Sequence, residues 1–266
     1  MIVDIEESRD PRIEASRDVR ERDLVGRQGL FVAEGRVVLE KAVAAGRHPL
    51  ISVLLARKRW AAMQPVLAGL PEATPVYLAD QSVLDTIAGF HLHRGVLALG
   101  RRAEPPAEGL LSALPAEALV VALSGIANHD NMGGVFRNAA AFGADSVLLD
   151  DSCCDPLYRK AIRVSVGAAL TMPFARAGTD AQLIRRLEAH GFEVMALSPS
   201  GGAELARFVP SGARIAALIG AEGPGLPPDL LGRTRSVRIP MSGGFDSLNL
   251  ATTSGIVLHH LRTVRG

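Results

Sequence analysis

Cysteine is almost absent from the sequence. The two that occur, Cys153 and Cys154, are adjacent, so a structural disulfide between them is geometrically unfavourable and two thiolates are too few for a metal site. No apolar run reaches the roughly 20 residues of a membrane-spanning helix. The acidic start (Asp4, Glu6, Glu7) lacks the basic flank and apolar stretch of a signal peptide. We therefore expect no bound metal, no membrane contact and a cytoplasmic location.

Aromatic residues and net charge are also scarce. Aromatics make up 4% of the chain, too few for the sheet platforms on which many RNA-binding domains stack bases. The formal net charge is +1, so a nucleic-acid-binding surface would have to be a local basic patch. The other proportions, 48% hydrophobic and 21% charged over 266 residues, are those of two small globular domains or one large α/β domain.

Strands and helices alternate in the first hundred residues. Apolar residues recur at helical spacing over 34–45 and stop at Gly46, a natural helix end. The pattern also predicts strands at 50–55, 75–78 and 95–100, and helices near 58–68 and from Asp80. We interpret residues 1–104 as a small α/β domain. The next segment, 105–116, contains three prolines and no convincing strand, and is the expected linker.

Residues 117–266 repeat the alternation more clearly. Near-continuous apolar strands are predicted at 118–124, 146–150, 192–198, 214–220 and 236–240, with helices between them. Strands of this kind, joined by crossovers, form a mainly parallel sheet covered on both faces. The pattern alone therefore predicts an open, doubly wound α/β sheet. Ligands of such sheets bind beyond the carboxyl ends of the strands, so the loops there are candidates for chemistry.

The first candidate loop is 125–140, in which polar residues and glycines lead into a helix. Free backbone N–H groups at such a helix start suit a phosphate. Arg137 is expected about one and a half turns into the helix and still close to the loop. Taken alone, an arginine on a helix is more often a surface charge or an ion-pair partner.

The second candidate loop, 220–228, has three glycines around Glu222. Such a backbone can approach a ligand closely. It matches neither the dinucleotide-binding nor the P-loop pattern, and alone it would be an ordinary glycine-rich turn. Glu222 argues for more, since a carboxylate there repels phosphate but could pair with an arginine or a cationic ligand.

The third candidate segment, 239–250, runs into a predicted helix over 248–263. Asp246 or Ser247 is the expected N-cap of that helix. Asn249 has no capping role in this interpretation, and its amide suits holding a hydroxyl or an adenine edge.

Together the three loops resemble the motifs of the SpoU (TrmH-like) RNA 2′-O-ribose methyltransferases, in the SPOUT superfamily. The motifs occur in the family's order as Asn131-x-Gly133-x-x-x-Arg137, then Gly220-x-Glu222-Gly223-x-Gly225-Leu226, then Ile239-Pro240-Met241 followed by Ser247-Leu248-Asn249. Asp246 stands where many relatives carry glutamate. The resemblance covers residues 117–266, and residues 1–104 resemble the family's N-terminal RNA-binding domain, which is similar to small α/β ribosomal proteins.

The resemblance implies a fold, a cofactor and an assembly. The mainly parallel sheet would contain a deep trefoil knot in place of the open sheet, and S-adenosylmethionine would be the cofactor of a homodimer acting on transfer or ribosomal RNA. In the family the C-terminal helix packs against a partner subunit. Here its apolar residues are Leu250, Val257, Leu258 and Leu261, which in a monomer would cover the chain's own sheet.

The resemblance also assigns roles to individual residues. The implied cofactor contacts are Gly220, Glu222, Gly223, Ile239, Met241 and Leu248, and the implied catalytic group is Arg137, Asn131, Glu222, Ser247 and Asn249. A guanidinium does not normally lose its proton, so we expect Arg137 to clamp an RNA phosphate and lower the pKa of the ribose hydroxyl electrostatically.

Two other functions compete with this interpretation. A catalytically inactive RNA-binding or assembly protein on the same fold would not need Arg137, Glu222, Ser247 and Asn249 together. A nicotinamide-dependent enzyme would need a glycine fingerprint after an early strand, and no such arrangement occurs in the sequence.

Overall fold

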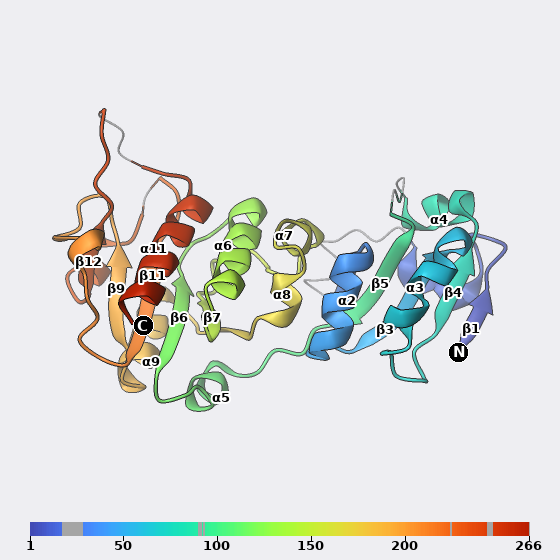
Figure 1. Cartoon of the computed structure of the whole chain (residues 1–266), viewed down its shortest axis with the longest axis horizontal. Coiled ribbons are helices and arrows are strands. Elements are labelled where there is room, and N and C mark those ends of the chain that lie inside the picture. Colours follow the sequence, from blue (N-terminus) through green and yellow to red (C-terminus); the bar gives the residue numbers. More distant parts are fainter. Residues whose placement is uncertain (18–28, 90–91, 93, 224, 244–246, 266) are drawn as a thin grey trace. The chain divides into compact units, whose positions relative to one another are not determined.

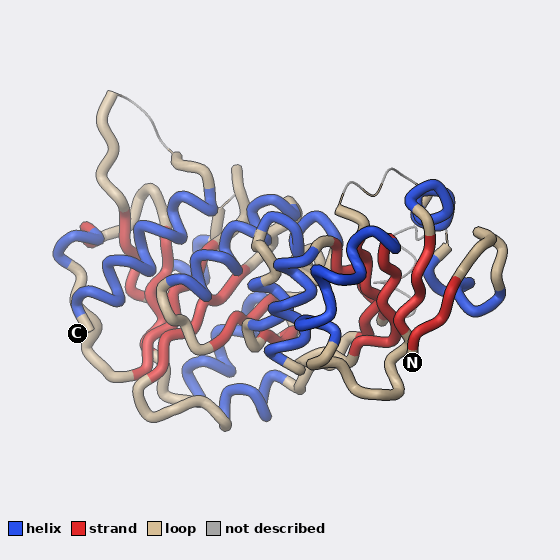
Figure 2. The backbone as a smooth tube through the Cα atoms, turned by 45° about the vertical axis from the view of Figure 1, so that its right-hand side comes forward, coloured by secondary structure: helices blue, strands red, loops and turns tan. Residues whose placement is uncertain are grey.

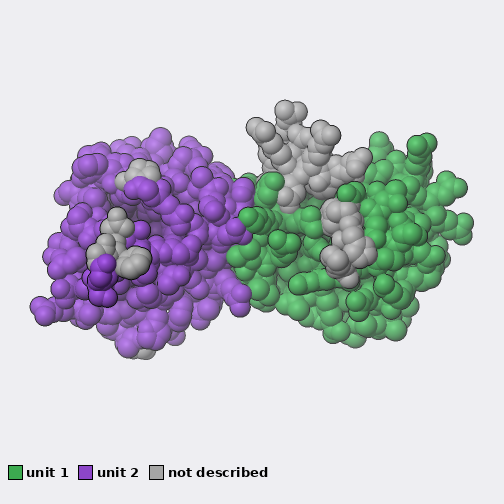
Figure 3. Space-filling model, turned by 90° about the horizontal axis from the view of Figure 1, so that it is seen from above, with its two compact units in different colours: residues 1–103, 155–171 green, residues 104–154, 172–266 purple. Residues whose placement is uncertain are grey.

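The computed structural model describes residues 1–17, 29–89, 92, 94–223, 225–243 and 247–265. Contacts divide the chain into two compact units, coloured separately in Figure 3. Unit 1 contains residues 1–103 and 155–171, and unit 2 contains residues 104–154 and 172–266. Unit 1 is thus built from two separate stretches of chain.

Unit 1 has a mixed sheet with the strand order β1-β4-β3-β5-β2. Its strands are β1 (Ile2–Asp4), β2 (Leu30–Glu34), β3 (Leu50–Ala56), β4 (Val76–Ala79) and β5 (Val96–Arg101). Its helices are η1 (Pro11–Ser16), α2 (Arg36–Ala45), η3 (Arg57–Arg59), α3 (Trp60–Leu67), α4 (Gln81–Ala88), α7 (Arg159–Val164) and α8 (Ala168–Thr171). Strands β1, β4 and β3 are parallel, and β5 is antiparallel to both β3 and β2.

The core of unit 1 includes residues from both of its stretches. Phe31 in β2 is fully buried, and a Cβ on Gly100 of the paired strand β5 would lie 2.2 Å from its Cζ. A glycine is therefore required opposite this ring. Helices α7 and α8 pack against β2 and α2, and Arg159 of α7 donates to the Glu34 carboxylate at 2.6 Å.

Unit 2 has a sheet of seven parallel strands in the order β10-β12-β9-β11-β6-β7-β8. Its strands are β6 (Ala118–Leu123), β7 (Ser146–Leu149), β8 (Phe174–Arg176), β9 (Glu193–Leu197), β10 (Ala203–Glu204), β11 (Arg214–Ile219) and β12 (Arg235–Arg238). Its helices are α5 (Ala107–Ser112), α6 (His129–Ala141), α9 (Asp180–Ala189), η4 (Leu205–Arg207), α10 (Pro228–Leu231) and α11 (Leu250–Val264). The mainly parallel α/β sheet predicted for residues 117–266 is confirmed.

Helices cover both faces of the unit 2 sheet (Figure 1). Helices α6 and α11 lie side by side on one face. On the other face, α5, α9 and α10 share one apolar cluster with β6 and β11, which includes Leu111, Leu187 and Leu230. After β12 the chain extends beyond the end of the sheet and then returns to α11, as Figure 2 shows.

Two segments of unit 2 bear on the sequence-based expectations. The segment 105–116, expected as the linker, contains α5, whose Leu110 and Leu111 are buried in the sheet core. The apolar residues of the C-terminal helix are also buried within the chain itself: Leu250, Val257, Leu258 and Leu261 are at most 4% exposed. A partner subunit therefore cannot be held by these four side chains.

Buried His48 gives unit 1 a pH-dependent stability. The imidazole is 4% exposed, its Nδ1 accepts from the Ala103 backbone N–H at 3.1 Å, and burial, with Arg47 and Arg102 nearby, lowers its pKa to about 4. Below pH 6.5, the ordinary pKa of histidine, His48 is protonated in the unfolded chain but stays neutral in the folded chain until about pH 4. We predict that the free energy of unfolding falls by about 2 kcal/mol between pH 6.5 and 5 from this residue alone.

The His48→Asn variant is the control, because an asparagine oxygen can still accept the Ala103 N–H while the titratable group is gone. Urea unfolding at both pH values should show a smaller loss of stability in the variant than in the wild type. Parallel pH dependence of the two proteins would contradict the prediction.

Candidate functional site

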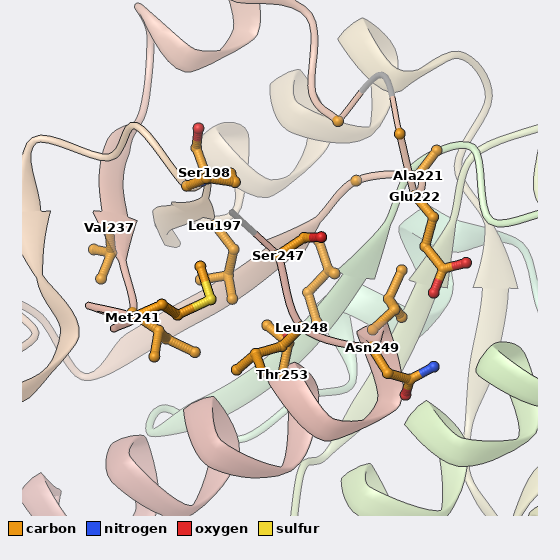
Figure 4. A pocket seen from close by; sticks show the side chains of 17 residues that line it. Leu197, Ser198, Ala221, Glu222, Val237, Met241, Ser247, Leu248, Asn249 and Thr253 are labelled. Atoms are coloured by element: carbon orange, nitrogen blue, oxygen red, sulfur yellow. The ribbon is translucent and has the colours of Figure 1, made fainter. Parts of the chain in front are cut away.

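A cavity of about 480 Å³ lies at the carboxyl ends of β9, β11 and β12 (Figure 4). Its walls come from the loops that follow these three strands and from the start of α11. The residues are Leu197, Ser198, Pro199, Ile219, Gly220, Ala221, Glu222, Gly223, Gly225, Val237, Ile239, Met241, Ser247, Leu248, Asn249, Leu250 and Thr253. This is the edge of a parallel sheet at which ligands are expected.

The cavity is apolar at one end and polar at the other. Leu197, Val237 and Met241 lie at one end in Figure 4, whereas Glu222 and Asn249 lie at the opposite end. Among the lining residues that the structure describes, Glu222 is the one with a charged side chain, and it is exposed. A ligand with an apolar face and a cationic group would match this division.

The glycine-rich loop after β11 closes into a tight turn. The Gly225 N–H donates to the Ala221 carbonyl oxygen at 3.1 Å, and Gly223 and Gly225 have φ values of +86° and +68°. A Cβ on Gly220 would lie 2.8 Å from the Gly225 carbonyl carbon. The turn thus needs glycine at these positions, and its backbone forms part of the cavity wall.

The loop after β6 lies directly beside this turn. The Ser124 N–H donates to the Ile219 carbonyl oxygen at 3.0 Å, and a Cβ on Gly125 would be 3.2 Å from the Ala221 Cβ. The first two sequence motifs therefore meet at one point of the sheet edge.

Asp150, at the end of β7, organises the loop after β6. Its carboxylate is buried and accepts from the backbone N–H groups of Gly125 (3.1 Å), Ser152 (3.1 Å) and Cys153 (2.9 Å) and from the hydroxyls of Ser124 (3.1 Å) and Ser152 (2.8 Å). A carboxylate with this many donors is held firmly despite its burial. Asp150 is not among the predicted site residues, although an aspartate directly after an apolar strand is a visible signal in the sequence.

The first backbone N–H groups of α6 are not all free, as the sequence had suggested they would be. The side chain of Asn128 is the N-cap and accepts from the backbone N–H groups of Asp130 (2.7 Å) and Asn131 (3.3 Å). Two of the donors that were expected to bind a phosphate are therefore already used within the protein.

Asn249 is the N-cap of α11, which begins at Leu250. Its Oδ1 accepts from the Thr252 N–H at 3.2 Å, and its Nδ2 donates to the Asn131 Oδ1 at 3.0 Å. The expectation that Asp246 or Ser247 caps a helix starting at 248 is therefore wrong for Ser247, while Asp246 lies outside the described residues. Asn249 does have a local structural role, and it also joins the first motif to the third.

Helices α6 and α11 pack very closely because of small and polar residues at their contact. A Cβ on Gly134 would lie 2.4 Å from the Ala251 Cβ. The Asn138 Nδ2 donates to the Ala251 carbonyl oxygen at 2.6 Å and to the Ser254 Oγ at 2.9 Å. Asn131 and Asn138 are seven residues apart and so lie on the same face of α6.

Arg137 lies on another face of α6. It is the ninth residue of the helix rather than a residue of the first turns, and it sits roughly 9 Å beyond Asn131 along the axis. At about 100° per residue it points roughly 120° away from Asn131. Arg137 is exposed, it does not line the cavity, and it has no ion-pair partner among the described residues.

The structure thus brings together most of the predicted site residues. All six residues expected to contact the cofactor line one cavity, as do Ser247 and Asn249 of the expected catalytic group. Asn131 is linked to the cavity through Asn249. The loop after β9 was missed, although Ser198 and Pro199 immediately follow a strand that the pattern predicted.

The described residues contain no group of three or more His, Cys, Asp or Glu side chains placed to hold a metal ion. Within the same described part of the chain, no helix is both long and apolar enough to cross a bilayer.

A family model described as the SpoU rRNA Methylase family matches residues 118–259, which contain β6 to β12 and the cavity. The chain belongs to this SpoU family. An uncharacterized tRNA/rRNA methyltransferase from Mycobacterium bovis is 38% identical, and the alignment covers 97% of this chain and 91% of that protein. An uncharacterized tRNA/rRNA methyltransferase from Synechocystis is 27% identical over 98% and 94% of the two chains.

Two solved structures of methyltransferases share the fold over nearly the whole chain. An rRNA methyltransferase from Sinorhizobium meliloti with bound AdoMet superimposes with a TM-score of 0.84, at 24% identity and 98% coverage of both chains. The SpoU methyltransferase AviRb from Streptomyces viridochromogenes, in complex with AdoMet, has a TM-score of 0.79 at 22% identity, with 97% and 98% coverage. The resemblance found in the three motifs is thereby confirmed.

The two hydrogen bonds of Asn249 can be separated by substitution. We predict that Asn249→Ala, which removes both, lowers the free energy of unfolding by about 1–2 kcal/mol, the usual cost of losing an N-cap. Asn249→Ser keeps an acceptor for the Thr252 N–H but cannot reach Asn131, so it should recover most of that loss. Urea unfolding of the three proteins measures the difference, and equal losses in both variants would show that capping contributes nothing.

Proposed function

We propose that this protein transfers a methyl group from S-adenosylmethionine to a ribose 2′-hydroxyl in structured RNA. The observation that carries the proposal is that the second and third SpoU motifs, which follow two different strands, line one cavity at the sheet edge. The names of the similar proteins support an RNA substrate, either transfer or ribosomal. A solved structure named RNA 2′-O ribose methyltransferase has the same fold, with a TM-score of 0.75.

The cavity fits S-adenosylmethionine in size and chemistry. Its volume lies within the range of about 300–1,000 Å³ typical of small-molecule sites. The backbone of Gly220 and Gly223, with Ile239, Met241 and Leu248, would hold the cofactor, and the Glu222 carboxylate offers a partner for a cationic group. When bound, the cofactor supplies a methyl group on a sulfonium, which is already a strong electrophile.

The chain's own residues would supply orientation and charge stabilisation. A ribose hydroxyl is a weak acid, so its developing negative charge needs a donor nearby. Glu222, Ser247 and Asn249 line the cavity and would orient the ribose. Asn131 holds Asn249 through its hydrogen bond and so fixes one of these groups.

Arg137 would act on the RNA from outside the cavity. Because it is exposed and directed away from the α11 contact, it can meet a phosphate of RNA bound across α6, or it can act on the cavity of a second subunit. Its planar guanidinium would clamp the phosphate with two hydrogen bonds and stabilise the charge on the hydroxyl.

We also propose that unit 2 is knotted. Strand β12 lies between β9 and β10, which are consecutive in the chain, and β9 pairs with β11. In a knotted chain the loop from β9 through β10 to β11 would encircle β12. Before β12 the chain is on the α9 face, with α10, and after β12 it is on the α6 face, with α11. Passage from one face to the other through this loop is what a trefoil knot requires.

Residues 1–104 would then form the RNA-binding domain of a cytoplasmic enzyme. This role of the N-terminal part is inferred from its likeness to the family's small ribosomal-protein-like domain. The homodimer is proposed as well. On α11, the exposed apolar side chain that could contact a partner subunit is Ile256, which is 39% exposed.

The central prediction separates cofactor binding from catalysis. Calorimetry should detect S-adenosylmethionine binding to the wild type and, with nearly equal affinity, to Arg137→Ala. Methyl transfer should fall by a factor of about 10²–10³ in the variant, since Arg137 acts on the RNA. The substrates are transfer RNA and ribosomal RNA from cells lacking the gene, tested separately, with alkaline cleavage to locate the protected ribose.

Arg137→Lys is the matched variant, because lysine keeps the charge but loses the planar fork. We expect it to restore little activity. Full activity of either variant would overturn the assignment of Arg137. An absence of binding heat at millimolar cofactor would instead favour the inactive RNA-binding or assembly protein.

The homodimer is tested by mass and by subunit mixing. Light scattering should give twice the 28.0 kDa chain mass at micromolar concentration, and Ile256→Glu should shift the protein towards a monomer. If Arg137 acts across the dimer, co-expressing the Arg137→Ala chain with a Glu222→Ala chain should restore part of the activity. A wild-type monomer would contradict the prediction.

A further inference from the structure

The sheet of unit 1 gathers positive charge at one of its ends. The register places the carboxyl ends of β2, β3 and β4 beside the start of β5, since Glu34 pairs with Leu97, Leu55 with Val96, and Ala56 with Ala79. Asp80 follows β4, but five other residues at these strand ends are basic: Arg36 after β2, Arg57, Lys58 and Arg59 after β3, and Arg94 before β5. All five are exposed.

Ion pairs already occupy two of these cations. Arg36 donates to Glu40 at 2.6 Å, and Arg57 lies between Asp4 and Asp80. Within the described residues, Lys58, Arg59 and Arg94 have no such partner, and we name these three the basic patch. The first turn of α2, which starts beside them, contains no acidic residue.

Glycines hold the arginine stems of the basic patch in place. A Cβ on Gly35 would lie 2.7 Å from the Arg94 Cδ, and a Cβ on Gly95 would lie 3.4 Å from the Arg59 Cγ. Both glycines have positive φ, +92° and +60°. The stems of Arg94 and Arg59 therefore pack on glycine turns at this sheet end, so less side-chain entropy is lost when they bind an anion.

The acidic side chains at this sheet end lie apart from the basic patch or are paired. Asp4 and Asp80 pair with Arg57, and the exposed carboxylates of Glu6 and Glu7 follow β1, the edge strand furthest from β5 and β2, whereas the basic patch lies over β3 and β5. At the opposite end of the same sheet, Arg101 is exposed and has no ion-pair partner among the residues that the structure describes, but Arg102 is paired with Asp155. Because the whole chain carries only +1, a local concentration of this kind is what RNA binding requires.

We propose that Lys58, Arg59 and Arg94 bind consecutive phosphates of the RNA substrate. The inference rests on the proposed function and adds the surface of unit 1 that holds the RNA. Guanidinium groups form bidentate hydrogen bonds with phosphate, and contacts to the backbone fix the position of a nucleic acid without reading its sequence. The basic patch therefore supplies affinity, while the choice of the methylated nucleotide is made elsewhere.

The test compares two double variants of the full-length protein with the same change of charge. Arg59→Ala/Arg94→Ala removes the basic patch, whereas Arg101→Ala/Arg185→Ala removes two exposed arginines elsewhere, at the other sheet end and on α9. Filter binding measures the affinity for bulk transfer RNA and, separately, bulk ribosomal RNA at several salt concentrations. The slope of log affinity against log salt should fall in magnitude by about 1.4 to 1.8 in the patch variant, since each phosphate contact contributes about 0.7 to 0.9. The control should keep the wild-type slope.

The variant Arg59→Lys/Arg94→Lys controls for misfolding. It changes the same two side chains but keeps both charges, so most of the slope of log affinity against log salt should remain. Cofactor binding by calorimetry should be unchanged in every variant. Equal slopes in the patch variant and the wild type, or equal losses in patch and control variants, would overturn the inference while leaving the proposed function intact. A wild type that binds no cofactor would instead refute the proposed function, and one that binds cofactor but no RNA would refute both.

Discussion

The close contact between α6 and α11 is the constraint on which the site depends. Gly134 lets the helices approach, and Asn138 ties α6 to the first turns of α11. With α11 fixed, Asn249 caps the helix at one point and meets Asn131 there. The segment that closes the cavity is thereby held against the loop after β6. A loss of this contact would release one whole wall of the cavity, although none of its residues faces the ligand space except Asn249.

The alternation of apolar segments predicted much of the fold. Every strand predicted in 117–266 is present, because a buried parallel strand leaves a continuous apolar run that a single sequence displays. β8 and β10 were missed, since they have three and two residues and leave no readable pattern. The short helix α5 could not be predicted within the expected linker, because prolines flank it on both sides. Only the burial of Leu110 and Leu111 in the sheet core shows that this segment is ordered as a helix.

The site could be predicted as a set of residues but not as an arrangement. Motif order indicated which loops matter, and glycine spacing indicated a tight turn at 220–225. Periodicity could not show that Asn249 caps α11, because the boundary of a helix shifts by a residue or two with its tertiary contacts. The direction of Arg137 was also out of reach, since it depends on which face of α6 packs against α11. The role of Asp150 became visible only when the loops after β6 and β7 were seen around one carboxylate.

Because unit 1 is formed by two separate segments of the chain, it cannot be exchanged as a single segment, either in evolution or by protein engineering. Residues 155–171 belong to unit 1 but are flanked on both sides by unit 2. Leu157, Ile162 and Leu170 are buried there, and Arg159 is paired with Glu34. Exchanging residues 1–103 as one cassette would therefore leave a stretch of apolar side chains without its core. A functional chimera has to replace both coding segments together. Residues 1–103 are therefore expected to evolve together with residues 155–171, which lie within the sequence of unit 2.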